Sequence, residues 1–190
     1  MSEYIQKELE VLIRARYPII YIVTWEEQRV EEVLVKIAQS RNKGMYSWTS
    51  TDGLSSPLIS GHFSEALKHP VAVLDHIMKS KEPSVLFVLK DYHHYIEEPL
   101  VIRKIKDAAE VIRKSRNTLI LLGSEMKIPP ELEKIVTILD YPLPGYKELE
   151  SRLDELINTV KKNPSVSISL TPAAKEKIIK AALGLTIQEA

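Results

Sequence analysis

Runs of consecutive apolar residues, separated mostly by helical patterns, constrain the fold of this chain more than any other feature. Four strong runs occupy residues 19–23, 84–89, 118–122 and 135–139, and a weaker one occupies 44–49. Because these runs are continuous rather than alternating, they are typical of strands buried on both faces of a parallel sheet. Helices between successive strands imply right-handed crossovers, which cover both faces. We therefore expect an α/β fold with a three-layer, five-stranded parallel sheet.

The helices are predicted from apolar residues that recur at helical spacing among charged residues. The expected helices lie at residues 4–14, 27–39, 71–78, 102–112, 145–157 and 172–182, and residues 51–69 have a Gly-, Ser- and Pro-rich loop signature. The break at Asn163-Pro164-Ser165 predicts a sheet domain over 1–162 and a partial helical region over 163–190. Thr186 and Glu189 have the spacing of a helix start, so we expect a piece of a longer protein.

Charge and composition argue against several classes of function. The 26 basic and 26 acidic residues cancel, so the chain as a whole lacks the positive field that drives binding to nucleic acid or an anionic membrane. The absence of Cys excludes disulfides, thiolate metal sites and a Cys nucleophile. No apolar run approaches the roughly 20 residues that span a bilayer, and the charged start is not signal-like. We expect a soluble intracellular protein with no nucleic-acid and no membrane partner.

The segment after the first apolar run is where a P-loop enzyme holds phosphate, because ligands bind at the carboxyl ends of parallel strands. The motif G-x-x-x-x-G-K-[ST] is absent, since none of the six Gly residues is followed by Lys. Thr24 and Glu27 have instead the spacing of a capping box, which would satisfy the first N–H groups of the next helix. Glu26 and Glu27 then form a solvated acidic turn. The alternative is a general-base or metal pair.

Lys90 and Asp91 follow the next strong run, where a Walker B motif would supply a Mg²⁺-binding Asp and then a catalytic Glu. A lysine ammonium cannot coordinate Mg²⁺. We expect Lys90 to form an ion pair with a neighbouring carboxylate such as Asp91, Glu97 or Glu98.

Asp91, His93 and His94 are the residue types of a zinc site, which makes a metal-dependent hydrolase an alternative. Adjacent His side chains are expected to point in different directions, however, and no second cluster supplies a fourth ligand. Exposed or partly stacked His residues are the simpler interpretation.

The remaining strand ends offer polar and aromatic residues with two interpretations each. Ser124 lies where many ATPases of this kind keep a polar sensor for the γ-phosphate, but it is equally an ordinary turn residue. Trp25 and Trp48 are expected near the same rim of the sheet, either as packing residues or as a partner surface. The basic run 113–116 is most simply a helix end that favours cations.

The order of these parts resembles the core of an AAA ATPase, a P-loop NTPase fold that ends in a helical lid. Four segments carry the resemblance, at residues 86–91, 118–124, 138–144 and 170–186. They are similar to the N-terminal half of an AAA family of cyanobacteria and algal plastids that is named only as a hypothetical chloroplast open reading frame. The resemblance covers essentially the whole chain.

The resemblance implies an N-terminal degenerate AAA-like domain, with residues 163–190 as the start of the lid. A C-terminal domain outside this chain would carry the working Walker motifs, so the full-length protein would be an ATPase and this part would not. The family is linked to the regulation of photosynthesis and inorganic-carbon use, in the cyanobacterial cytoplasm or the plastid stroma.

No cofactor, metal or catalytic residue is therefore assigned. The remnant of the ancestral site comprises Trp25, Glu26, Lys90, Asp91 and Ser124. The expected function is protein interaction or assembly, with protein partners, the protein's own C-terminal AAA domain, or copies of itself in a ring. The alternatives are a nucleotide sensor that binds ATP or ADP without hydrolysis, and the metal-dependent hydrolase.

Overall fold

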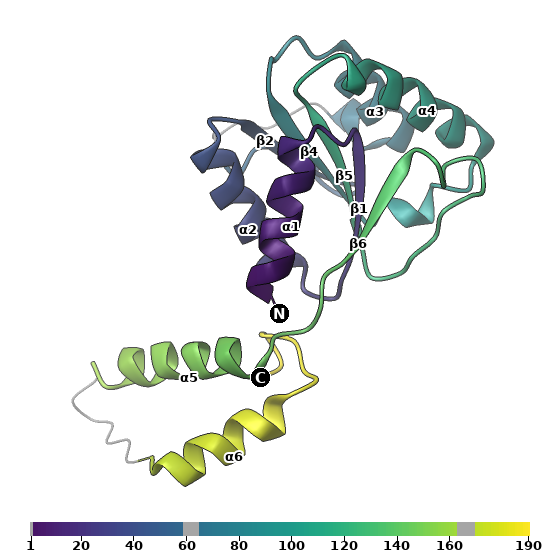
Figure 1. Ribbon diagram of the computed structural model, residues 1–190. Helices are drawn as coiled ribbons and strands as arrows, with labels where there is room; N and C mark the ends of the chain where they lie inside the picture. The colour runs from purple at the N-terminus through teal and green to yellow at the C-terminus, as the bar shows by residue number, and fades with distance from the viewer. Residues whose placement is uncertain (1, 59–64, 163–169) are drawn as a thin grey trace. The chain divides into compact units, whose positions relative to one another are not determined.

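The computed structural model describes residues 2–58, 65–162 and 170–190 of the chain (Figure 1). Residues 3–141 form one compact unit, which contains the sheet, and residues 142–190 belong to a second. Residues 142–162, which the sequence pattern assigns to the sheet domain, fall in the second unit by their contacts. The domain assignment of 1–162 and 163–190 stays a prediction.

The sheet has six strands in the order β3-β2-β4-β5-β1-β6. The strands are β1 (Ile19–Val23), β2 (Gly44–Thr49), β3 (Gly53–Ser55), β4 (Val85–Lys90), β5 (Thr118–Gly123) and β6 (Val136–Asp140). All pairs are parallel except β2 with β3. The five expected strands and their parallel pairing are confirmed.

Strand β3 corrects the expectation that residues 51–69 form only a loop. Leu54 pairs with Trp48 of β2 in an antiparallel register, and both side chains are fully buried. The turn before β3 is closed by the Thr49 hydroxyl, which accepts a hydrogen bond from the Asp52 N–H at 3.0 Å. Gly53 then adopts a left-handed φ of 75°, which a residue without a Cβ tolerates well. Part of the expected loop, residues 59–64, lies outside the described residues.

Helices cover both faces of the sheet, as the continuous apolar runs predict (Figure 1). Helices α1 (Ser2–Arg14) and α2 (Glu27–Ser40) pack on one face, and α3 (Pro70–Lys79) and α4 (Pro99–Arg113) pack on the other. Neighbouring residues of β1 face opposite sides, since Ile20 belongs to the first core and Tyr21 to the second. Among the described residues, this unit also contains the short 3-10 helices η1 (Glu65–Lys68) and η2 (Tyr92–His94).

The second unit contains α5 (Tyr146–Val160) and α6 (Pro172–Ala182). Lys175 of α6 pairs with Glu150 and Asp154 of α5 at 3.3 and 2.9 Å. The helix-start signal near the end of the chain is confirmed, because the Thr186 N–H donates to Glu189 and the Glu189 N–H donates to the Thr186 hydroxyl. The break at Asn163-Pro164-Ser165 lies outside the described residues.

Candidate functional site

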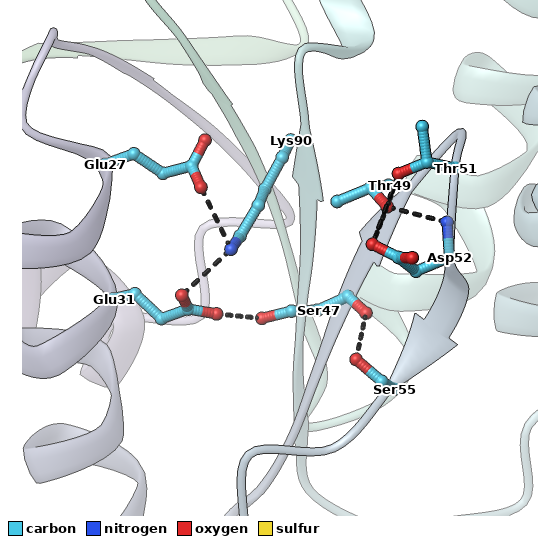
Figure 2. A network of polar contacts seen from close by, with 8 residues as sticks. All are labelled: Glu27, Glu31, Ser47, Thr49, Thr51, Asp52, Ser55 and Lys90. Carbon is cyan, nitrogen blue, oxygen red and sulfur yellow. Dashed lines mark hydrogen bonds and ion pairs between the residues drawn. The ribbon is translucent and has the colours of Figure 1, made fainter. Parts of the chain in front are cut away.

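Lys90 is the centre of a charged cluster at the carboxyl ends of the parallel strands. Its Nζ lies 3.1 Å from Glu27 Oε1 and 2.9 Å from Glu31 Oε2, both on α2 (Figure 2). Only 13% of the Lys90 side chain is exposed, so the ammonium is held in place rather than solvated. The expected ion pair of Lys90 is confirmed in kind. Its partners are not the expected Asp91, Glu97 or Glu98.

The crossover between β1 and β4 explains which carboxylates Lys90 meets. Glu27 and Glu31 are four residues apart on α2, so they lie on the same helix face, and α2 packs against the sheet. Glu31 was missed by sequence reasoning although its spacing from Glu27 was a readable signal. Its second oxygen accepts a hydrogen bond from the Ser47 hydroxyl at 2.5 Å, which joins the cluster to β2 (Figure 2).

The electrostatics of this cluster favour the charged lysine. Burial lowers the pKa of Lys90, but hydrogen bonds and charges from Glu31 and Glu27 more than offset this effect and leave the pKa above its usual value. The ammonium is therefore positively charged at neutral pH and neutralised by its own protein. A phosphate group that approached Lys90 would have to compete with two carboxylates already in contact.

The expected capping box at the start of α2 is wrong. The Thr24 hydroxyl accepts a hydrogen bond from the Glu26 N–H at 2.9 Å, and Glu27 contacts Lys90 instead of the backbone. Glu26 occupies the N-cap position and its side chain makes no capping hydrogen bond. The physical reason is that the turn at Thr24 closes one residue early, which leaves the Glu27 carboxylate facing the cation on β4.

Glu26 is also not part of a solvated acidic turn. Its side chain is 4% exposed and lies 3.7 Å from Arg29, whose guanidinium stacks over the Tyr141 ring at 4.6 Å from the centroid. A buried carboxylate is stable when a cation and hydrogen bonds surround it, and Arg29 supplies that cation. The short connection between β1 and α2, residues 24–26, is thus built around internal charge pairs.

Asp91, His93 and His94 do not assemble into a metal site. Within residues 2–58, 65–162 and 170–190 there is no group of three or more His, Cys, Asp or Glu residues arranged to hold a metal ion. The expectation that the two imidazoles point apart is wrong, because their ring centroids are 4.1 Å apart with a tilt of 40°. Asp91 is exposed and has a left-handed φ of 54°.

His93 is buried against β5. An added Cβ on Gly123 would lie 2.6 Å from His93 Nδ1, so the imidazole fills the space above that glycine. Burial lowers the pKa of His93, and the neighbouring His94 lowers it further. A neutral, packed imidazole is therefore a structural element of this edge. Ser124, which follows Gly123 in sequence, is half-buried.

The two tryptophans have different environments. Trp48 is fully buried, and its ring makes edge-to-face contacts with Tyr92 and Tyr95. Trp25, two residues after the end of β1, is 72% exposed. The packing interpretation holds for Trp48, whereas Trp25 has the exposure that a partner surface requires.

Fold and site together define an AAA-type domain of the P-loop NTPase class, in which Lys90 at the carboxyl ends of the strands is paired with Glu27 and Glu31. Solved structures agree on the fold. Caenorhabditis elegans PCH-2 covers 98% of this chain with a TM-score of 0.58 at 16% identity, and the chain covers 60% of that structure. For a variant of Thermotoga maritima RuvB the TM-score is 0.59 at 14% identity, over 95% of this chain and 56% of RuvB.

The family is identified from sequence. Residues 5–141 match the model of the SpoVK-like AAA ATPase N-terminal domain, and the chain belongs to this family. It is 33% identical to the AAA domain-containing protein ycf46 of Trieres chinensis over 183 residues and to that of Guillardia theta over 186. These alignments cover 95% and 96% of the chain. The expected kinship with an N-terminal AAA domain is confirmed.

The chain spans 35% of the length of each of these two relatives. Within the part of the chain that the structure describes, none of the helices combines the length and the apolar character needed to cross a membrane.

Proposed function

We propose that this chain is a non-catalytic AAA-like domain that serves in protein interaction or assembly within a longer AAA protein. One observation carries the proposal. The lysine at the carboxyl ends of the strands is bound by both Glu27 and Glu31, so this edge holds two carboxylates for one ammonium, a net negative charge that disfavours a nucleotide phosphate. Phosphate recognition needs donors and positive charge that are free to face the ligand.

Trp25 supports the interaction role. Its indole is 72% exposed at the same edge as Lys90, and Met126, which follows the neighbouring strand β5, is 60% exposed. Tryptophan and methionine are enriched at protein interfaces, where their apolar surface is removed from water. In the full-length protein, the C-terminal AAA domain, a separate protein or a neighbouring copy in a ring would cover this edge.

Two further points belong to the proposal through the resemblance alone. The full-length protein is an ATPase through its C-terminal domain, and it acts in the regulation of photosynthesis and inorganic-carbon use in a cyanobacterial cytoplasm or a plastid stroma. The kinship with AAA domain-containing ycf46 proteins supports the first point, and the second rests on the resemblance.

Calorimetric titration with ATP and ADP in the presence of Mg²⁺ tests the proposal. We expect that Lys90 makes no contribution to nucleotide binding. The wild-type chain and the Lys90→Ala variant should therefore give the same isotherm up to millimolar nucleotide. Lys104→Ala is the matched control, because Lys104 pairs with Asp75 between α4 and α3, away from the candidate site.

Binding that weakens in Lys90→Ala but not in Lys104→Ala would overturn the proposal in favour of a nucleotide sensor. In that case Lys90 would have to leave both carboxylates to contact phosphate. A second readout is the exposed indole. If Trp25 anchors a partner, Trp25→Ala should weaken association with the C-terminal half of the protein and leave the unfolding temperature of this domain unchanged.

A further inference from the structure

A second charged region lies at the opposite edge of the sheet, where the parallel strands begin. It is a cavity of about 330 Å³. Its charged lining consists of five cations and one carboxylate, namely Arg14, Arg16, Arg41, Lys43, Arg116 and Glu10. Lys43 directly precedes β2, and Arg116 lies two residues before β5. These cations come from three separate segments of a chain whose total formal charge is zero.

Most of this positive charge is not neutralised. Arg41 forms an ion pair with Glu10 of α1. Among the described residues, no carboxylate forms an ion pair with Arg14, Arg16 or Arg116. The three guanidinium groups therefore have donors available for a ligand, in contrast to Lys90 at the other edge.

Lys43, which lines the cavity, is held by two hydrogen bonds. Its Nζ donates to Ser84 Oγ at 3.0 Å and to the Arg116 carbonyl oxygen at 2.7 Å. Burial lowers the pKa of Lys43, and the charges of Arg16 and Arg116 lower it further. The cations are thus close enough to repel one another, and an anion in the cavity would relieve that repulsion.

A further feature of this edge is the backbone conformation of Arg16. This residue follows α1 with a φ of 61°, in the left-handed region that favours glycine at such a position. The turn is closed by the Tyr17 N–H, which donates to the Leu12 carbonyl at 3.2 Å. A residue with a long cationic side chain occupies a position where glycine would fit with less strain. That side chain lines the cavity.

The helix dipoles give a partial explanation of this composition. Helices α1 and α2 end at this edge, and cations are favourable near helix C-termini by a few tenths of a kcal/mol to about 1 kcal/mol each. The dipoles account for basic residues in the last turns. They do not require that cations from three segments converge on one concave site, where burial and then the charges of Arg16 and Arg116 lower the pKa of Lys43.

We propose that this cavity binds a small anion that carries two phosphate groups. Arginine forks match phosphate oxygens with paired hydrogen bonds, and the lining has an excess of four positive charges. Two phosphate groups bring about three to four negative charges at neutral pH, whereas a single carboxylate brings one. The cavity volume lies at the lower end of small-molecule sites, which span about 300 to 1,000 Å³.

Calorimetric titration with pyrophosphate at constant ionic strength tests this proposal on the chain as it is. We expect saturable binding at one site and a higher unfolding temperature in its presence. Arg16→Gly removes a guanidinium while suiting the left-handed backbone, and Arg116→Gln removes another without touching the carbonyl that Lys43 uses. Each substitution should weaken binding about tenfold, the loss of one charge-assisted hydrogen bond.

Arg103→Gln is the matched control, since Arg103 pairs with Asp107 on the exposed side of α4 and should leave the affinity unchanged. Equal weakening in this control would mean that the chain attracts anions by charge alone, and the proposal would fail. It would also fail if millimolar pyrophosphate gave neither heat nor a shift in unfolding temperature. If a poly-glutamate peptide bound more tightly than pyrophosphate, the proposal would be overturned, and the cavity would be a site for an acidic protein segment.

The outcome is distinguishable from that of the proposed function. ATP carries phosphate groups, so the cavity could produce heat in an ATP titration. Such binding should weaken in Arg16→Gly and stay unchanged in Lys90→Ala. The reverse pattern would point to the strand ends at Lys90.

Discussion

The two edges of the sheet differ in how their charged side chains are arranged. At the carboxyl edge, Lys90 is neutralised by Glu27 and Glu31, and Glu26 lies beside Arg29. At the amino edge, five cations surround a cavity whose lining contains one carboxylate. A P-loop fold places its ligand chemistry at the carboxyl edge. Here that edge is closed by internal pairs, and the groups available to an external anion are at the other end of the strands.

The two edges belong to one fold but differ in which charges are paired, so the fold alone does not decide where an anion could bind. The strand order and the crossovers are those of an AAA domain, yet Thr24 and Glu26 after β1 bond to each other and Lys90 at the end of β4 pairs with Glu31. Function has to be argued from the side chains at each edge. The comparison also predicts opposite responses of the two edges to substitution.

Gly123→Ala gives the largest expected effect, because it tests how tightly the carboxyl edge is packed. The new Cβ would lie 2.6 Å from Nδ1 of the buried His93, closer than any stable contact. We expect the free energy of unfolding to fall by about 2 to 3 kcal/mol in urea denaturation. The double variant Gly123→Ala/His93→Ala should recover part of that loss, since it removes the clashing ring.

Gly44→Ala is the control for the glycine substitution. Its added Cβ would meet Val85 Cγ2 at 3.4 Å, an ordinary contact, so the free energy of unfolding should change by less than about 0.5 kcal/mol. Equal losses in both variants would show that the carboxyl edge is no more tightly packed than the start of β2.

Lys90→Met should destabilise the chain by about 1 to 2 kcal/mol, because it leaves Glu31 half-buried without its cation. Lys104→Met is the matched control, with a more exposed ion pair to Asp75 and an expected loss below about 1 kcal/mol. Chemical denaturation measures both. Adding Glu31→Gln to Lys90→Met should restore stability, and failure to do so would mean that the ion pairs are not what Lys90 contributes.

Arg16→Gly should stabilise the chain, in contrast to Lys90→Met, and raise the free energy of unfolding by about 0.5 to 1 kcal/mol. The substitution relieves a left-handed φ of 61° and removes one of the mutually repelling cations. Arg14→Gly, at the last residue of α1, should instead cost up to about 1 kcal/mol because glycine is a poor helix former. A loss of stability in Arg16→Gly would contradict a charge-crowded amino edge.

The parallel sheet was predictable from sequence because strands that are buried on both faces consist of consecutive apolar residues. The five runs became β1, β2, β4, β5 and β6. Strand β3 was not predictable in the same way, since three residues that include Gly53 and Ser55 resemble a loop. Its pairing depends on Leu54 reaching the core beside Trp48, a contact that only the folded chain creates.

At the candidate site, the sequence predicted that Lys90 pairs with carboxylates but did not predict which carboxylates they are. A lysine in a metal-binding position had to pair with carboxylates, and it does. Glu97 and Glu98 are close to Lys90 in sequence, whereas Glu31 is brought to it by the crossover from β1 through α2. The burial of Glu26 depends equally on tertiary structure, because Arg29 stacks on the distant Tyr141.

The smallest expected effect is a pH dependence at the carboxyl edge. Burial and the charge of His94 lower the pKa of His93 below its ordinary value of 6.5, with weaker influences from Asp91, Glu125 and Lys127. The unfolded chain therefore takes up a proton before the folded chain does, so stability should fall as pH drops below about 6.5. His93→Gln should flatten this part of the curve of unfolding free energy against pH, while His76→Gln on α3 should not. An unchanged slope in His93→Gln would mean that the packed imidazole titrates as freely in the folded chain as in the unfolded one.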